Sequence, residues 1–238
     1  MAEVSFSSPH GSFRGYLARP VGNGPWPGVL VIHDVFGASN DLRSQCEWLA
    51  ASGYLAFGPD LYSQGSKLSC LRSMFLDLRA RRGKTFDNID AARTTLLENP
   101  DCNGRVGVIG YCMGGGFSLL LAPEGHYGAS SVNYGDVPKD VDDVLAGACP
   151  VVASYGAKDR TLKGRAARLE HSLTLNNVAH DVKEYPDAGH GFLNQHGGAP
   201  GILIAVLGRL VGQGYDESAA ADARVRIIEF FDRYLKAS

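Results

Sequence analysis

The chain has 238 residues, of which 20% are charged, and a formal net charge of −2 at pH 7. This length suits one α/β domain with an ordinary core, and the charge gives no reason to expect a nucleic-acid or acidic-membrane partner. No apolar run approaches the ~18 residues of a membrane span, and no signal peptide is recognisable at the N-terminus. The 30 glycines follow no Gly-X-Y period, so we expect them in tight turns and close backbone contacts.

The cysteines are odd in number, and no two lie within three residues of each other. This spacing argues against a disulfide framework, a zinc ribbon and a CxxC redox pair. We therefore expect a cytoplasmic protein with free thiols that needs neither a metal nor an organic cofactor. The cysteines are Cys46, Cys70, Cys102, Cys112 and Cys149.

Short apolar runs alternate with helical patterns along the chain. Residues 13–18 are predicted to form an antiparallel edge strand, and the continuous apolar run 28–33 is typical of a strand that is covered on both faces. Further strands are predicted at 54–58, 105–110, 129–134, 150–155 and 180–185. Helices are predicted at 39–52, 84–99, 114–121, 164–176 and 224–235.

This alternation predicts the α/β class, with a mostly parallel central sheet and helices on both faces. The sequence contains no internal repeat, no low-complexity tract and no linker long enough to divide it. We therefore expect a single domain over residues 1–238.

The segment GYCMGGG, residues 110–116, lies between a predicted strand and a predicted helix. It has the G-x-nucleophile-x-G form of a nucleophile elbow, with Cys112 in the place of the more common serine. Glycines beside the nucleophile leave room for a strained turn, and the dipole of the following helix favours a thiolate. The alternative is a glycine-rich turn with an incidental cysteine, because the segment does not fit the phosphate-loop patterns.

Two partners for Cys112 follow it in the order acid, then histidine. Asp159 follows the predicted strand 150–155, and His190 follows the strand 180–185, so both emerge at the same sheet edge as Cys112. Asp159 would orient His190, which would move protons to and from the thiol. Asp159 as a helix cap and Asp187 as a competing carboxylate stay open. The other histidines are interpreted as surface or turn residues: His10, His33, His126, His171, His180 and His196.

These motifs resemble the dienelactone hydrolase family of the α/β-hydrolase superfamily. The resemblance runs from about Arg14 to the C-terminus, and its other markers are PDLY (59–62), YGAKDR (155–160) and AGHGF (188–192). It implies an α/β-hydrolase fold and a catalytic triad of Cys112, His190 and Asp159.

The resemblance also implies roles for the segment after the first long strand. Asp34 stands where the family has an acid, normally a longer glutamate, that contacts the resting thiol. A loop carboxylate that caps the next helix is its alternative. The backbone N–H groups of Val35 and Met113 are the implied oxyanion donors.

The expected contacts to substrate differ from those of the family. Asn194 stands where the family carries a basic residue that binds the substrate carboxylate. A cluster of arginines could supply another, although a solvated helix face explains it more simply: Arg72, Arg79, Arg81 and Arg82. The apolar segment 199–214 could cover the pocket, contact another subunit or pack in the core.

The sequence thus predicts a hydrolase of small esters or lactones that works through a covalent acyl-enzyme on Cys112, as a monomer or homodimer. A small-molecule substrate is the expected partner. The alternative is a non-catalytic homologue in which the pocket binds a ligand and Cys112 senses redox state.

Overall fold

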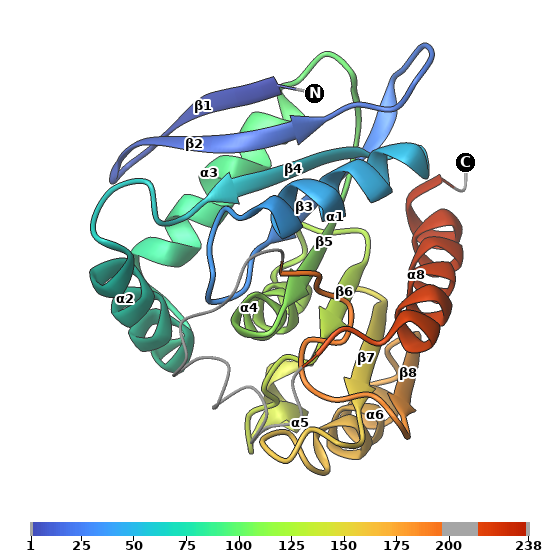
Figure 1. Ribbon diagram of the computed structural model, residues 1–238. Coiled ribbons are helices and arrows are strands. Elements are labelled where there is room, and N and C mark those ends of the chain that lie inside the picture. Colours follow the sequence, from blue (N-terminus) through green and yellow to red (C-terminus); the bar gives the residue numbers. More distant parts are fainter. Residues whose placement is uncertain (1, 197–213, 237–238) are drawn as a thin grey trace.

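The strands of the protein pair into one eight-stranded sheet with the order β1-β2-β4-β3-β5-β6-β7-β8 (Figure 1). The structure is a computed structural model that describes residues 2–196 and 214–236. The strands are β1 (Ala2–Ser8), β2 (Gly11–Ala18), β3 (Trp26–Ile32), β4 (Leu55–Asp60), β5 (Cys102–Tyr111), β6 (Ser130–Asn133), β7 (Val151–Gly156) and β8 (His180–Tyr185). The predicted segment 199–214 lies outside the described residues except for Gly214.

Strands β3 to β8 run parallel to one another, whereas β2 runs antiparallel to both of its neighbours, β1 and β4. The predicted mostly parallel central sheet is therefore confirmed. The prediction that residues 13–18 form the edge is wrong, because β1 pairs outside β2 and occupies the edge itself (Figure 1). Sequence pattern missed β1 because Phe6 is its only buried residue.

The helices cover both faces of the sheet (Figure 1). In β3, Val29 and Val31 belong to a core cluster with residues of α1 and α8, whereas Leu30 and Ile32 belong to one with residues of α3. Since neighbouring strand residues point to opposite faces, these helices lie on opposite sides. The helices are α1 (Asn40–Ala51), α2 (Lys67–Ala80), α3 (Lys84–Leu97), α4 (Met113–Leu121), α5 (Val141–Val144), α6 (Arg165–Leu175) and α8 (Glu217–Phe231).

Two helices differ from their prediction. Helix α2 was not predicted because Met74 is its only buried residue, so its sequence carries little amphipathic pattern. Helix α8 begins at Glu217 rather than at residue 224, because Asp216 caps it by accepting a hydrogen bond from the Ala219 N–H. None of the helices in the described ranges has both the length and the apolar character needed to cross a membrane.

The parallel strands direct several loops to one edge of the sheet. Strands β3, β5, β7 and β8 all end there, and the segments that follow them carry Asp34, Cys112, Asp159 and His190. Ligands of open α/β sheets bind outside the carboxyl ends of the strands. This edge therefore holds the candidate site.

Candidate active site

Cys112 occupies a strained turn between β5 and α4. Its backbone has φ 55° and ψ −115°, in a region that non-glycine residues rarely adopt. The Cys112 N–H donates to the Asn133 carbonyl at 3.0 Å, and the Cys112 carbonyl accepts from the Gly116 N–H at 3.2 Å. The cysteine thus has the strained strand-to-helix geometry of a nucleophile elbow.

The elbow requires glycine on both sides of the cysteine. A Cβ atom at Gly110 would lie 1.9 Å from the Gly114 carbonyl oxygen, and one at Gly114 would lie 2.3 Å from the Ile32 carbonyl oxygen. Both obstacles are backbone atoms that cannot rotate away. The close approach of helix α4 to strands β3 and β5 therefore depends on these two residues.

The strain at Cys112 predicts an inverted stability order for two variants. Glycine adopts this conformation without steric cost, whereas alanine keeps the strain, which costs about 1–3 kcal/mol. Allowing for the greater unfolded-state freedom of glycine, we expect Cys112→Gly to be more stable than Cys112→Ala by about 1 kcal/mol. Thermal unfolding should show a Tm about 2–4 °C higher for the glycine variant. An alanine variant of equal or higher Tm would contradict a strained elbow.

Asp159 and His190 form a close pair. The His190 Nδ1 lies 2.6 Å from the Asp159 Oδ2, and the Asp159 side chain is 1% exposed. The Thr161 N–H and hydroxyl both donate to the other carboxylate oxygen, at 2.9 and 2.6 Å. Asp159 therefore organises its own turn and orients the imidazole at the same time.

The protonation of this pair follows from its surroundings. Burial lowers the pKa of His190, but interactions with Asp159 and with the Cys112 thiol outweigh burial and raise this pKa to about 10. Burial raises the pKa of Asp159, yet the hydrogen bonds from His190 and Thr161 bring it below its usual value. At neutral pH the pair is thus an imidazolium beside a carboxylate, and the imidazolium also faces Cys112.

The competing carboxylate predicted from sequence lies elsewhere. Asp187 has an 84% exposed side chain and forms an ion pair with Lys158 at 3.0 Å. The structure brings Asp159, rather than Asp187, to the ring of His190.

Asn194 anchors the loop that carries His190. It is buried, it accepts a hydrogen bond from the Tyr134 hydroxyl, and its amide donates to the Asp41 carboxylate. The Gln195 N–H donates to the same carboxylate at 2.6 Å, and the ring of Tyr134 packs against His190 with centroids 5.3 Å apart. No local sequence pattern indicates the roles of Asp41 and Tyr134, because these contacts join residues far apart in the chain.

The loop after β3 carries the predicted oxyanion donor Val35. The Tyr62 hydroxyl donates to the Val35 carbonyl at 3.1 Å, and His33 Nδ1 donates to the Asp34 carbonyl at 2.7 Å. Burial lowers the pKa of His33, so this ring is neutral, and its Nε2 accepts from the Leu61 N–H at 3.3 Å. Side chains therefore hold the carbonyls of Asp34 and Val35 in this loop. The role of the Val35 N–H as an oxyanion donor stays a prediction.

Met113, the other predicted oxyanion donor, is the first residue of α4 and directly follows Cys112. Its side chain is buried against the core. An N–H at this position belongs to the first turn of a helix and needs no partner within it. The location suits an oxyanion donor, and the role stays a prediction.

Asp34 binds groups other than the thiol. Its Oδ1 accepts from the Phe36 N–H at 2.8 Å, and its Oδ2 lies 2.9 Å from His196 Nε2. No hydrogen bond joins Asp34 to Cys112 among the described residues, so the predicted thiol contact stays a prediction. His196, which the sequence pattern indicates as a surface or turn residue, is partly exposed and lies beside this loop.

The arginine cluster predicted from sequence lies on and after α2. Arg81 forms an ion pair with Asp140 at 2.5 Å, which ties the end of α2 to the segment before α5. The other arginines of the cluster are exposed: Arg72, Arg79 and Arg82. This arrangement supports the solvated-face interpretation for the cluster.

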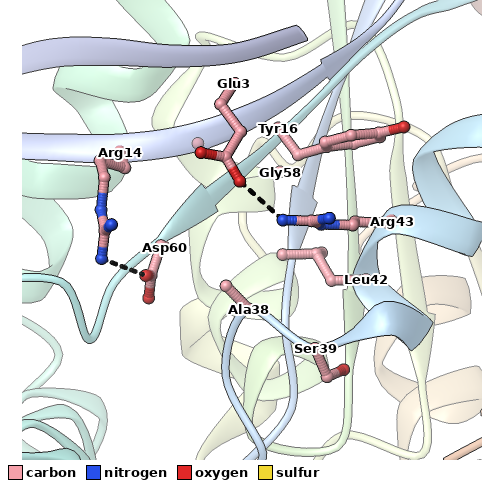
Figure 2. Close-up of a pocket in the computed structure, with 10 residues that line it drawn as sticks. Glu3, Arg14, Tyr16, Ala38, Ser39, Leu42, Arg43, Gly58 and Asp60 are labelled. Carbon is pink, nitrogen blue, oxygen red and sulfur yellow. Dashed lines mark hydrogen bonds and ion pairs between the residues drawn. The ribbon is translucent and has the colours of Figure 1, made fainter. Parts of the chain in front are cut away.

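A separate surface cavity of about 190 Å³ lies between β1, β2, the end of β4 and the start of α1 (Figure 2). Its charged side chains are paired within it: Arg14 lies 3.9 Å from Asp60, and Arg43 lies 2.6 Å from Glu3. Because each cation already faces a carboxylate, we assign no ligand to this cavity.

A nucleophile elbow, a histidine after the last strand and a carboxylate after the preceding strand are the features of an α/β-hydrolase. The sequence model of the dienelactone hydrolase family matches residues 13–235. The chain belongs to that family, which confirms the resemblance seen in the sequence, and it is a dienelactone hydrolase-like hydrolase.

Two relatives, from Pseudomonas putida and Pseudomonas knackmussii, are described as carboxymethylenebutenolidase; each is 27% identical over 237 residues, covering 95% of this chain and 94% of the relative. The crystal structure of a dienelactone hydrolase from Anabaena variabilis has a TM-score of 0.67 and 22% identity, covering 98% and 97% of the two chains. A dienelactone hydrolase-like promiscuous phosphotriesterase from metagenomic libraries has a TM-score of 0.81 and 21% identity, with the same coverage. At these identities the two structures support the fold.

Proposed function

We propose that the protein hydrolyses small esters or lactones through a covalent acyl-enzyme on Cys112, with His190 as the proton carrier and Asp159 as its orienting acid. The observation that carries the proposal is the 2.6 Å contact of His190 with Asp159, at the sheet edge where Cys112 occupies its strained turn. A purely ligand-binding homologue has no need of an imidazole held between an acid and a thiol.

The proposed reaction has two halves. The thiolate of Cys112 attacks the carbonyl carbon, a C–S bond forms, and the oxyanion is stabilised by the N–H groups of Val35 and Met113. The C–O bond then breaks, and the leaving oxygen takes the proton of His190. In the second half, the neutral His190 takes a proton from water, whose oxygen attacks the thioester, and the thiolate leaves. The thiolate and the imidazolium are thereby restored.

The contacts of the site favour a substrate without a carboxylate. Asn194 is buried and bonded to Tyr134 and Asp41, so it is not available to a ligand. Arg81 is paired with Asp140. We propose neutral esters and lactones with an enol or phenol leaving group, because a thiolate expels a stable oxyanion more readily than an amine.

Trapping the acyl-enzyme tests the proposed function. With p-nitrophenyl acetate we expect a burst of one p-nitrophenolate per active site, and mass spectrometry of the acid-quenched protein should find one acetyl group on the peptide that contains Cys112. Prior alkylation of Cys112 should abolish both signals. Acetylation of another residue with undiminished turnover after alkylation would contradict the mechanism.

A pair of lactones that differ only in a carboxylate supplies the second arm of this test. We expect kcat/KM for the neutral lactone to equal or exceed that for the carboxylated one. A strong preference for the carboxylated lactone would contradict the neutral substrate class, and it would return Arg72, Arg79 and Arg82 as candidates for an anion site.

The cytoplasm is the compartment that we propose for this chemistry. All five cysteines are free, with Cys46 buried and the other four partly buried. A reducing compartment keeps such thiols, including the nucleophile, from pairing.

A further inference from the structure

A second histidine lies beside the site, on the loop that follows His190. The Nε2 of His196 lies 2.9 Å from Asp34 Oδ2, and its ring packs on that of Phe36 with centroids 4.3 Å apart. The other oxygen of Asp34 accepts the Phe36 N–H at 2.8 Å. His196 therefore contacts both the carboxylate and the residue that this carboxylate holds.

Between Asp34 and Phe36 lies Val35, the proposed oxyanion donor. Two groups hold the inner side of this loop: the Tyr62 hydroxyl binds the Val35 carbonyl, and His33 binds the Asp34 carbonyl. His196 holds the outer side, through the Asp34 side chain. An oxyanion hole works only if its donors are fixed before the reaction, so the orientation of the Val35 peptide matters directly to the rate.

His196 differs in its charge from His33 and Tyr62, the two side chains that hold the inner side of this loop. Burial lowers the pKa of His196, but the hydrogen bond and attraction of Asp34, together with the attraction of Asp41 on α1, raise it above the usual value. On the inner side, burial lowers the pKa of His33 and raises that of Tyr62, so both are neutral near pH 7.

The other titratable groups that act on the loop come from neighbouring elements. Asp60 at the end of β4 acts on His33, while Cys70 on α2 and Cys112 at the elbow act on Tyr62. These act on the inner contacts, whereas His196 alone of the described residues forms an ion pair with Asp34. Its side chain is 24% exposed, so it can exchange its proton with solvent.

We propose that His196 is a positioning residue for the oxyanion hole: as an imidazolium it clamps Asp34 and thereby fixes the Val35 peptide, and this clamp weakens to a neutral hydrogen bond when His196 loses its charge. The inference rests on the proposed hydrolase function and adds to it a control of the rate by pH. Because the pKa of His196 is raised in the folded protein, the charged clamp is present below about pH 6.5, and its charge is lost as the pH rises through the raised pKa of His196.

His196→Gln separates the charge from the contact. The glutamine amide can reach the position of the Nε2 atom and still donate to Asp34, but it carries no charge. We expect kcat for p-nitrophenyl acetate at pH 6.5 to fall roughly tenfold, less than for the loss of a whole oxyanion donor. The wild-type profile of kcat against pH should also contain an alkaline decline that the variant lacks.

The rate at which iodoacetamide alkylates Cys112 distinguishes positioning from general damage. Alkylation of a thiolate forms no oxyanion, so we expect the same alkylation rate in wild type and His196→Gln. His126→Gln is the matched control, because His126 is exposed and contacts none of these groups, and it should leave kcat and its pH profile unchanged. An unaltered profile in His196→Gln, or alkylation that falls in parallel with kcat, would overturn the inference.

A titration of the His196 ring by nuclear magnetic resonance tests the ion pair without catalysis. Its pKa should lie above 6.5 in the wild type and should fall in Asp34→Asn. If the pKa of His196 in the wild type is not raised, the proposed clamp is overturned and the proposed hydrolase function is unaffected. If hydrolysis does not depend on Cys112, the proposed function fails, and the catalytic role of His196 fails with it even where the ring titrates as expected.

Discussion

Replacing Cys112 with alanine is expected to lower kcat/KM for p-nitrophenyl acetate by at least about 10³-fold, which leaves only the residual rate of binding and oxyanion stabilisation. The reason is that the variant has no atom to form the proposed acyl-enzyme, while His190 and Asp159 keep their 2.6 Å contact. The variant also keeps the backbone of the elbow, because alanine fits wherever cysteine does. Initial rates, normalised to the concentration of folded protein, measure the effect.

Cys102→Ala is the matched control for this experiment. Cys102 lies on the same strand as the elbow but at its opposite end, where β5 begins, and it too is a partly buried free thiol. We expect this variant to keep its activity within about twofold of wild type, since surface-side substitutions rarely disturb a distant site. Equal losses in both variants would point to a general need for the thiols, and equal near-background rates in wild type and Cys112→Ala would favour the ligand-binding or redox-sensing alternative.

The parts of the site that sequence could predict are those that a local pattern specifies. The segment GYCMGGG itself specifies the elbow. A Cβ atom at Gly110 or Gly114, the glycines on either side of Cys112, would collide with backbone atoms. Asp159 and His190 each follow a parallel strand, and the sheet brings their loops to one edge without further information. The order of strands and helices along the chain was therefore sufficient to predict the positions of Asp159 and His190.

The supporting contacts could not be predicted because their partners are distant in sequence. The sequence indicates only that Asn194 stands where the family has a basic residue. In the fold, Asn194 joins Asp41, 153 residues away, to Tyr134. His196 carries no motif, and only the packing of its loop beside the end of β3 brings it to Asp34. The residues around His196 in the sequence do not indicate that it contacts a buried carboxylate.

The second large expected effect is a loss of stability when a glycine of the elbow is replaced. We expect Gly114→Ala to destabilise the fold by about 3 kcal/mol or more, because its Cβ would meet the Ile32 carbonyl oxygen at 2.3 Å and the His33 carbonyl oxygen at 2.7 Å. Neither atom can move without displacing β3, and with it the Val35 loop. The expected fall in Tm is about 6–12 °C, and kcat should fall as well because β3 leads into the loop that holds the proposed oxyanion donor, Val35.

Gly116→Ala provides the control within the same helix. Its Cβ would meet only the side chain of Leu78, at 3.1 Å, and that side chain can rotate. Alanine is also favoured over glycine in a helix interior by about 1 kcal/mol, which offsets the adjustment. We therefore expect a Tm within about 3 °C of wild type and retained activity. If Gly114→Ala were as stable as Gly116→Ala, the close packing of α4 on β3 would not be what holds Cys112 in its strained turn.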